Sequence, residues 1–170
     1  QVTVSGDNSS KYESPLLYTL GAEYTVTPWY RISINSSKNY RIPTLNDLFW
    51  PGAGNPDLKP ETSLQHELTN TLIFKDFNFK LTGYYNKIKD LIVWLPVSGE
   101  VWKPVNTNKV LIKGIEVEAS YTKHIRNHYF RIGLSYGYTN SENRETNRQL
   151  MYVPYHKFVG SLLYKYKRIN

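Results

Sequence analysis

The stretch from Tyr40 to Glu61, YRIPTLNDLFWPGAGNPDLKPE, decides how this chain is organised. It holds four of the nine prolines and a Gly-Ala-Gly run. Proline lacks the N–H that a sheet ladder needs, and it pushes the preceding residue toward extended or turn geometry. The stretch nevertheless carries Leu45, Leu48, Phe49 and Trp50. We therefore expect an ordered loop, without secondary structure of its own, that packs on another part of the protein.

Segments on both sides of this loop alternate apolar and polar residues, while residues 1–15 are polar and are expected to form a loop. The alternation runs through residues 16–26, 29–35, 63–74, 77–86, 114–121, 130–138 and 158–166. A period of two places successive side chains on opposite faces of a strand. One face is rich in Leu, Ile, Tyr and Phe, and the other carries Glu23, Arg31, Glu67, Lys80, Glu116, Glu118 and Arg131. The pattern predicts an all-β chain of about seven to eight antiparallel strands.

The connections between these strands alternate in length. Short turns at 27–28, 75–76 and 123–128 follow every other strand, and long segments at 40–61, 87–108 and 140–154 follow the rest. We expect residues 87–108 to form a hairpin of their own. Aromatic residues gather beside the short turns, as in the interfacial girdle of an outer-membrane barrel, whose periplasmic turns are short and whose extracellular loops are long. The pattern favours an up-and-down transmembrane β-barrel with its charged face inward.

Two other classes stay open at this point: a soluble β-sandwich that binds carbohydrate, and a small complete membrane barrel such as an adhesin. An antiparallel up-and-down barrel needs an even number of strands. About seven strands, with strands close to both ends of the chain, therefore indicate a piece of a larger barrel. The mixed charges of the polar face fit a wide lumen better than a narrow interior filled by side chains.

Composition limits the chemistry further. The net charge is +7, but lysines and arginines appear scattered singly, so we do not expect nucleic-acid binding. Without cysteine there is no thiolate nucleophile or thiolate metal site. His124 and His128 bracket a turn, and Asp57 and Glu61 lack the spacing of a calcium loop. We expect no metal, no cofactor and no enzymatic activity.

The motifs of the central loop resemble those of TonB-dependent outer-membrane receptors. Tyr40-Arg41-Ile42-Pro43-Thr44 is followed by Asp47-Leu48-Phe49 and then by Gly54-Asn55-Pro56-Asp57-Leu58-Lys59-Pro60-Glu61. Further matches are Tyr84-Tyr85-Asn86, Lys89-Asp90-Leu91-Ile92, Asn106, Lys113-Gly114-Ile115-Glu116 and Val153-Pro154-Tyr155-His156. The order of these matches follows the family from residue 30 to residue 166. One departure is Val153, which stands where arginine is usual before the proline.

The resemblance implies a segment from the C-terminal half of a 22-stranded, plugged barrel. Residues 1–170 are then expected to belong to the barrel domain, with the plug domain and the last strands of the barrel absent. It is closest to the vitamin B12 (cobalamin) receptor branch, and siderophore and haem receptors share much of it. It implies uptake of a small-molecule chelate, driven by the periplasmic TonB complex through the plug, and contact with outer-membrane lipid. The family motif corresponds here to Arg41, Pro43, Asn55, Pro56, Leu58, Pro60, Glu61, Gly114 and Glu116. Candidates for substrate contact in the extracellular loops are Trp50, Asn55, Asp57, Trp94, Trp102 and Tyr152.

Overall fold

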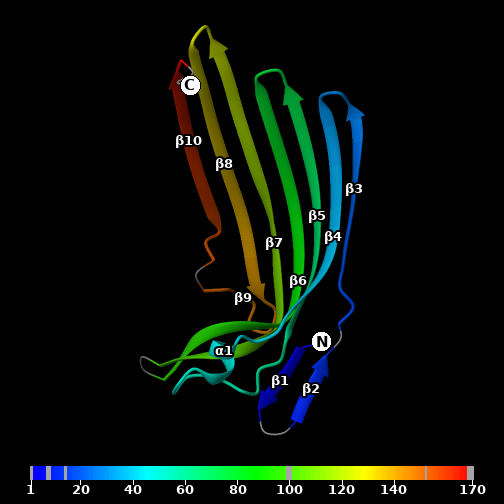
Figure 1. The fold of residues 1–170 in the computed structure, drawn as a ribbon, viewed down its shortest axis with the longest axis vertical. Coiled ribbons are helices and arrows are strands. Elements are labelled where there is room, and N and C mark those ends of the chain that lie inside the picture. The colour runs from blue at the N-terminus through cyan, green and yellow to red at the C-terminus, as the bar shows by residue number, and fades with distance from the viewer. Residues whose placement is uncertain (1, 7–8, 14, 99–100, 152, 168–170) are drawn as a thin grey trace.

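The protein is almost entirely antiparallel sheet in its computed structural model, which describes residues 2–6, 9–13, 15–98, 101–151 and 153–167 (Figure 1). Seven strands lie side by side in chain order: β3 (Tyr18–Thr27), β4 (Tyr30–Arg41), β5 (Glu61–Phe74), β6 (Phe77–Ser98), β7 (Val101–Ile125), β8 (His128–Asn143) and β10 (His156–Tyr166). The short β9 (Arg148–Gln149) pairs with β8. This confirms the predicted antiparallel up-and-down sheet.

The strand register sorts the side chains onto two faces. Ala22, Ile34, Leu68, Gly83 and Ile115 stand directly opposite one another across five strands, so the apolar face is continuous. The other face carries ion pairs between neighbouring strands, with Arg31 Nε 3.3 Å from Glu23 and Lys80 Nζ 3.0 Å from Glu118. Large residues of the apolar face are exposed in every strand of the sheet.

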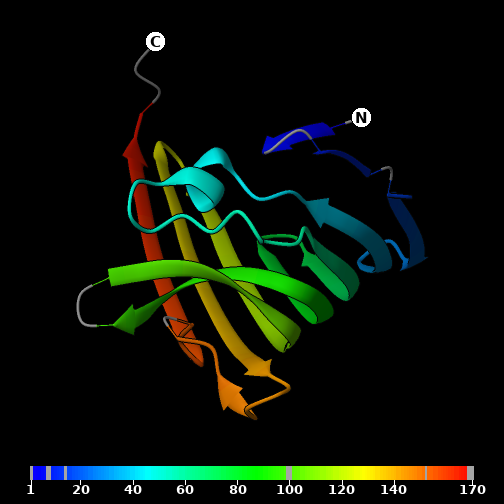
Figure 2. The same cartoon turned by 90° about the horizontal axis from the view of Figure 1, so that it is seen from below.

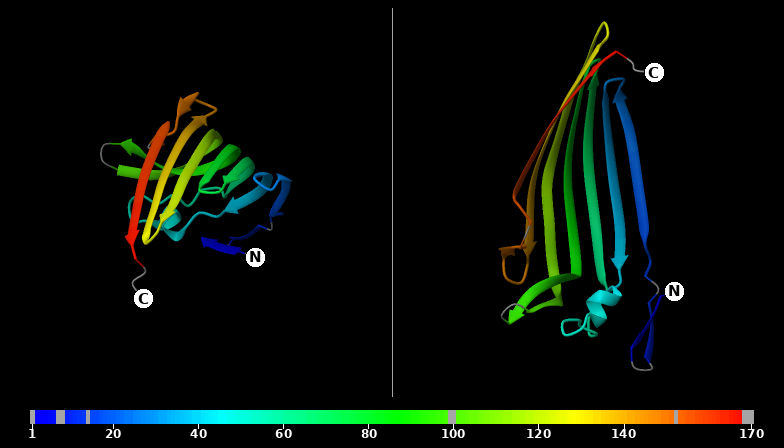
Figure 3. Two further views of the ribbon diagram at one scale, coloured as in Figure 1. Left: turned by 90° about the horizontal axis from the view of Figure 1, so that it is seen from above. Right: turned by 60° about the vertical axis from the view of Figure 1, so that its left-hand side comes forward.

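The sheet is curved, and its two ends differ. The two-residue turns at Pro28–Trp29, Lys75–Asp76 and Arg126–Asn127 share one end, the turn end, and the long connections share the other, the loop end (Figure 1). Views along the strands from both ends place the long connection after β4 on the concave side of the sheet (Figures 2 and 3). The predicted alternation of short and long connections is therefore confirmed.

Aromatic rings gather at the turn end as the sequence indicated. The rings of Trp29 and Phe74 stack with centroids 5.1 Å apart, and those of Phe130 and Tyr164 lie 4.9 Å apart. His128 stacks on Tyr164 and hydrogen-bonds to its hydroxyl group at 2.8 Å. Rings with one apolar body and one polar tip suit a boundary between hydrocarbon and water.

The strands β6 and β7 extend beyond the sheet as a two-stranded hairpin, confirming the hairpin predicted for residues 87–108. Pairing of β6 with β5 stops at Lys89, and pairing of β7 with β8 stops at Val110. Pairing between β6 and β7 continues to Ser98 and Val101. Asp90, the first residue of β6 past the sheet, has a φ of 55°. Among the described residues, no helix has the length and apolarity to span a membrane.

Three sequence expectations were wrong in detail. Residues 1–15 were expected to be a loop, but β1 (Val2–Gly6) and β2 (Ser9–Glu13) form an antiparallel hairpin. Residues 140–154 were also expected to be a loop, but β8 runs to Asn143 and pairs with β9. Polar strands can pair through their backbone without showing apolar alternation, so a periodicity search misses them. The segment 40–61 contains a short helix, α1 (Leu45–Phe49).

The lysines are also less scattered than the sequence indicated. The register gathers four of them, Lys87, Lys89, Lys109 and Lys113, on neighbouring positions of β6 and β7. They lie on the face that carries Leu81 and Ile115, because all odd-numbered residues of these two strands share that face. Cross-strand register, which the sequence alone does not reveal, creates this cluster.

Candidate functional site

The helix α1 is short because Thr44 caps its N-terminus and Pro51 prevents its continuation. Thr44 is the N-cap: its hydroxyl accepts from the Asp47 backbone N–H at 3.1 Å, and the Asp47 carboxylate accepts from the Thr44 N–H at 2.9 Å. This reciprocal pair is a capping box. Pro51 follows the C-cap Trp50 and cannot continue the helix. Gly54 N–H then donates to the Trp50 carbonyl at 2.7 Å, which folds the chain back on itself.

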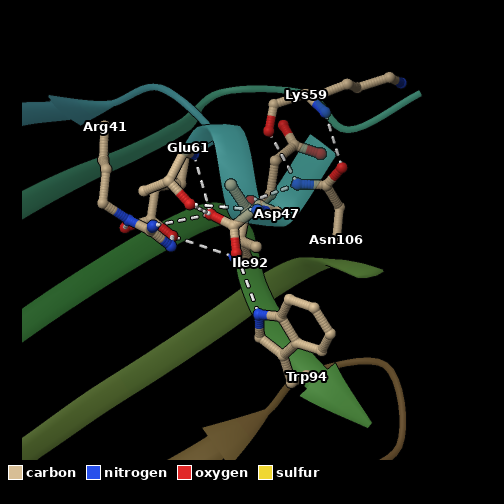
Figure 4. A network of polar contacts seen from close by, with 9 residues as sticks. Arg41, Asp47, Lys59, Glu61, Ile92, Trp94 and Asn106 are labelled. Atoms are coloured by element: carbon tan, nitrogen blue, oxygen red, sulfur yellow. Dashed lines mark hydrogen bonds and ion pairs between the residues drawn. The ribbon is translucent and has the colours of Figure 1, made fainter. Parts of the chain in front are cut away.

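Asp47 is the centre of a polar network that joins α1 to the β6–β7 hairpin (Figure 4). Its carboxylate accepts hydrogen bonds from the Thr44 hydroxyl at 2.9 Å and from Trp94 Nε1 at 3.0 Å. Arg41 lies 3.6 Å from the same carboxylate. Burial by itself would raise the pKa of Asp47, but the hydrogen bonds from Thr44 and Trp94 and the charge of Arg41 outweigh it and lower the pKa. Asp47 is thus held ionised, although it is buried.

Arg41 and Glu61 form a second part of this network, at the place where the loop leaves β4 and enters β5. The guanidinium donates to both carboxylate oxygens of Glu61, at 2.7 and 3.0 Å. Glu61 also accepts the backbone N–H of Ile92 at 3.0 Å. Two parallel N–H···O bonds fix the geometry of such a pair. The pair therefore closes the base of the loop and ties it to the hairpin.

Two asparagines attach the far part of the loop to β7. Asn55 Nδ2 donates to the Pro104 carbonyl at 3.0 Å, and Asn55 Oδ1 accepts from the Asp57 N–H at 3.1 Å. Asn106 accepts from the Lys59 N–H at 2.8 Å and donates to the carbonyls of Lys59 and Asp90, at 2.9 and 2.7 Å. The bond from Asn106 to the Asp90 carbonyl fixes the backbone at the point where β6 leaves the sheet, where Asp90 has a positive φ.

A small apolar core lies under this network. Leu48, Leu58 and Ile92 are only 4, 8 and 7% exposed and contact one another. Each comes from a different segment: the helix, the end of the loop and the hairpin. We call the assembly of residues 42–60, 90–98 and 101–107 the cap. Its contacts confirm the expectation that the loop is ordered and packs on another part of the protein.

The cap accounts for most of the motif residues. Arg41, Asn55 and Glu61 make the contacts above, Pro43 and Leu58 are buried, and Pro60 is half-buried, whereas Pro56 is exposed. Gly114 and Glu116 lie instead on the polar face of β7. A Cβ on Gly114 would collide with the Tyr138 carbonyl and with the Tyr84 ring, so only glycine fits there. The Tyr84 hydroxyl in turn bonds to Thr139 across the strand between them.

The candidates for substrate contact fall into three groups. Trp50, Asp57 and Trp102 are exposed at the loop end. Asn55 and Trp94 use polar atoms for contacts within the cap. Tyr152 lies outside the described residues. Contact of these residues with a substrate stays a prediction.

Three residues whose side chains form the network, Thr44, Asp47 and Asn106, were absent from the sequence-based set of site residues. Asp47 was readable as the fourth residue of a Thr-x-x-Asp capping box. Asn106 is one of the motif matches, but no local pattern predicted its contacts, because its partners Lys59 and Asp90 are distant in the sequence. Among the residues the structure describes, no three His, Asp or Glu side chains are placed to hold a metal ion.

The two-faced sheet, the sorted connections and the cap agree with the comparison to known families. Residues 1–169 match the family described as TonB dependent receptor-like, beta-barrel. The chain belongs to the TonB-dependent receptor β-barrel family. Members of this family are multi-strand barrel proteins of the Gram-negative outer membrane, so the apolar face of the sheet is the lipid face and the polar face is the lumen face.

Individual TonB-dependent receptors resemble the chain to different degrees. A vitamin B12 transporter, BtuB, of Photobacterium profundum is 31% identical over 154 residues, which are 88% of this chain and 25% of the relative. Among solved structures, the copper transporter OprC superposes with a TM-score of 0.68 at 20% identity, covering 85% of this chain and 23% of that one. The ferric enterobactin receptor PfeA of Pseudomonas aeruginosa gives 0.64 at 19% identity, covering 85% and 25%. The chain thus spans about a quarter of the length of these relatives.

Proposed function

We propose that this chain is part of an outer-membrane receptor that actively takes up a large, scarce nutrient, and that the nutrient is cobalamin. The observation that carries the proposal is the 31% identity with a vitamin B12 transporter across 88% of the chain. A second vitamin B12 transporter, of Vibrio vulnificus, is 30% identical over 75% of the chain. The solved siderophore receptors are more distant in sequence, at about 20% identity.

The exposed surface of the loop end suits a large ligand with a flat apolar face. Trp50 is 53% exposed, Trp102 is 39% exposed, and Asp57 of the loop motif is also exposed. Aromatic faces pack well on macrocycles, and a few polar groups orient a bound ligand. We propose Trp50, Asp57 and Trp102 as contacts. Asn55 and Trp94 use Nδ2 and Nε1 for hydrogen bonds within the cap, so we propose that only their other atoms contact the ligand. Tyr152 is a further candidate.

In the uptake mechanism that we propose, this chain forms part of the barrel wall and does not move the ligand itself. The ligand binds on the extracellular side, the periplasmic TonB complex acts on a plug domain, and a path opens through the lumen. The strands described here form part of the wall of that path. Their lumen face is polar and carries paired charges, such as Lys80 with Glu118, which a water-filled or plugged interior tolerates. We expect this function to involve no catalysis.

A ligand-binding experiment tests the nutrient assignment. The intact protein, purified in detergent, is titrated calorimetrically with cobalamin, with haem and with ferric enterobactin. We expect saturable binding of cobalamin and at least a hundredfold weaker binding of the other two. Saturable binding of a ferric siderophore or of haem instead would transfer the assignment to the second candidate within the same family. Binding of none of the three would contradict the proposed ligand class.

Single substitutions test the contact residues. Trp50→Ala and Trp102→Ala are each expected to weaken ligand binding by about tenfold or more, because base-sized aromatic stacking contributes about 1–3 kcal/mol. Trp29→Ala, at the opposite end of the sheet, is the matched control and should leave the affinity unchanged. If Trp50→Ala and Trp102→Ala bind the ligand as tightly as Trp29→Ala, Trp50 and Trp102 do not contact the ligand.

A further inference from the structure

Four lysines form a compact patch on the lipid face, where β6 and β7 leave the sheet; we call Lys87, Lys89, Lys109 and Lys113 the lysine patch. Lys89 and Lys109 are directly opposite each other across the two strands. Lys87 is opposite Leu111, so Lys109 and Lys113 are its two diagonal neighbours. Directly opposite side chains start about 5 Å apart and diagonal ones about 7–8 Å apart. All four lysines are exposed.

The ammonium groups of the patch are not paired with carboxylates in the described part of the chain. Glu142 is directly opposite Leu111 and is thus a diagonal neighbour of Lys109 and Lys113, but its carboxylate pairs with Arg144 at 3.0 Å. Other lysines of the same strands are paired: Lys80 with Glu118 at 3.0 Å, and Lys123 with Asp76 at 2.6 Å. Like charges directly opposite each other destabilise a sheet, so an unpaired patch costs stability unless an anion occupies it.

The height of the patch on the sheet places it at the surface of the lipid. Lys87 is ten residues and Lys89 twelve residues along β6 from Phe77 at the turn end. With a rise of about 3.4 Å per residue and a tilt of about 40°, these positions lie roughly 26 and 31 Å above Phe77. The apolar band of an outer-membrane barrel is about 25 Å tall. Lys87, Lys89 and Lys109, which is opposite Lys89, therefore lie just outside the hydrocarbon at the loop end. Lys113 is opposite Tyr85, roughly 21 Å above Phe77, at the upper edge of the apolar band. Ile115 lies below it on the same face.

We propose that the lysine patch binds the phosphate groups of the glycolipid, lipid A, in the outer leaflet of the membrane. Ammonium groups bind phosphate as point charges, and four of them match the charge of a doubly phosphorylated headgroup. The apolar face directly below accommodates the acyl chains of the same molecule, which a soluble polyanion would not use. The Lys87 ammonium group, 5.6 Å from the centroid of the Tyr85 ring, sits at this junction of headgroup and chain. This site is separate from the cap and from uptake of the nutrient.

Native mass spectrometry of the intact protein in non-ionic detergent tests the site, with doubly phosphorylated lipid A as the probe. The variant Lys89→Gln/Lys109→Gln is expected to bind lipid A at least tenfold more weakly than the unmodified protein. Lys75→Gln/Lys167→Gln removes the same charge at the turn end and should change the affinity less than twofold. Lipid A without phosphates should bind the unmodified protein at least tenfold more weakly. Lys87→Gln/Lys113→Gln repeats the test with the other pair.

Thermal unfolding separates a lipid site from a structural role. Without lipid A, Lys89→Gln/Lys109→Gln should unfold at a higher temperature than the unmodified protein, because the like-charge repulsion is gone. Addition of lipid A should raise the unfolding temperature of the unmodified protein and not that of the variant. Unchanged lipid A affinity in both patch variants, equal binding of phosphate-free lipid A, or displacement by an equal concentration of inorganic phosphate would each overturn the proposal.

Discussion

The sheet and the cap differ in the exposure of their main apolar residues. In the sheet, large residues such as Leu20, Ile34 and Leu162 are exposed on a continuous face. In the cap, Leu48, Leu58 and Ile92 are buried in a small core under a polar network. Both regions belong to the same chain and are joined through β4, β5, β6 and β7.

This difference follows from the surroundings of the two regions, which are lipid for the sheet and water for the cap. Exposed apolar side chains are favourable where the surroundings are lipid, and the sheet then needs only backbone hydrogen bonds within the ladder. The cap lies past the lipid, and burial of Leu48, Leu58 and Ile92 stabilises it as in a water-soluble domain, although other apolar side chains such as Leu45 and Trp50 stay exposed. Its stability therefore depends on a few buried contacts.

The largest effect is expected for a charge on the exposed apolar face of the sheet. Ile34 is 56% exposed, lies between Ala22 and Leu68, and is near the middle of β4. Ile34→Arg should destabilise the protein in a bilayer by about 2–4 kcal/mol, because the guanidinium would face hydrocarbon. Denaturant unfolding of the intact protein in liposomes measures this change.

Leu45→Arg is the matched control for that prediction. Leu45 is even more exposed, at 76%, but it belongs to α1 in the cap. Its substitution should change the stability by less than about 0.5 kcal/mol, because an exposed position in water tolerates charge. Equal costs at the two positions would show that both regions share one solvent, and the lipid-facing assignment would then fail.

The next largest effect is expected in the core of the cap. Leu48→Ala should cost about 2–3 kcal/mol, the low end for a buried leucine, because the three-residue core can partly collapse. The loss should be local: hydrogen exchange at the backbone amides of Lys59 and Ile92 should accelerate while global unfolding of the barrel is unchanged. If global unfolding shifts by the same amount, the cap and the sheet unfold as one unit and the contrast between them disappears.

Much of the sheet could be predicted from the sequence because its two faces differ so strongly. Residues 16–26 and 158–166 show the alternation directly, and the strands β3 and β10 follow them within two residues. Strand extensions were missed where polar residues pair through the backbone, as from Thr139 to Asn143 in β8. The register between neighbouring strands was also not predicted, since it depends on where each turn begins. The register of β6 and β7 places the four lysines of the patch next to one another.

The cap was predictable in outline but not in its contacts. Prolines and apolar residues in the stretch 40–61 indicated an ordered loop, and Asp47 could have been recognised from Thr44 three residues earlier. The partners Trp94 and Asn106 lie 47 residues from Asp47 and Lys59. Contacts over such separations depend on the tertiary fold, so a single sequence gives no physical signal for them.

Removal of the Asp47 charge should have a smaller effect than the core substitution. Asp47→Asn keeps the size of the side chain but weakens the bonds from Thr44, Trp94 and Arg41, at a cost of about 1.5 kcal/mol. Trp94→Phe, which removes one donor, should cost about 1 kcal/mol. Chymotrypsin cleavage after Phe49 in the intact protein reports undocking of the cap. Asn46→Ala, a change at an exposed neighbour in α1, should leave cleavage unchanged, and faster cleavage in that variant would mean that any change in α1 opens the cap.

The smallest effect is expected from acid. The pKa of Asp47 in the docked cap lies below its ordinary value of 3.8, so an undocked loop takes up a proton at higher pH than the docked one. This contribution is fully present well above pH 3.8 and is lost as the pH falls from there through the lowered pKa. Fluorine NMR of a fluorinated Trp94 should therefore show the undocked fraction rising only below about pH 4, where protonation of Asp47 begins. The Asp47→Asn variant should show no such rise, and a rise that persists in the variant would assign the titration to a carboxylate other than Asp47.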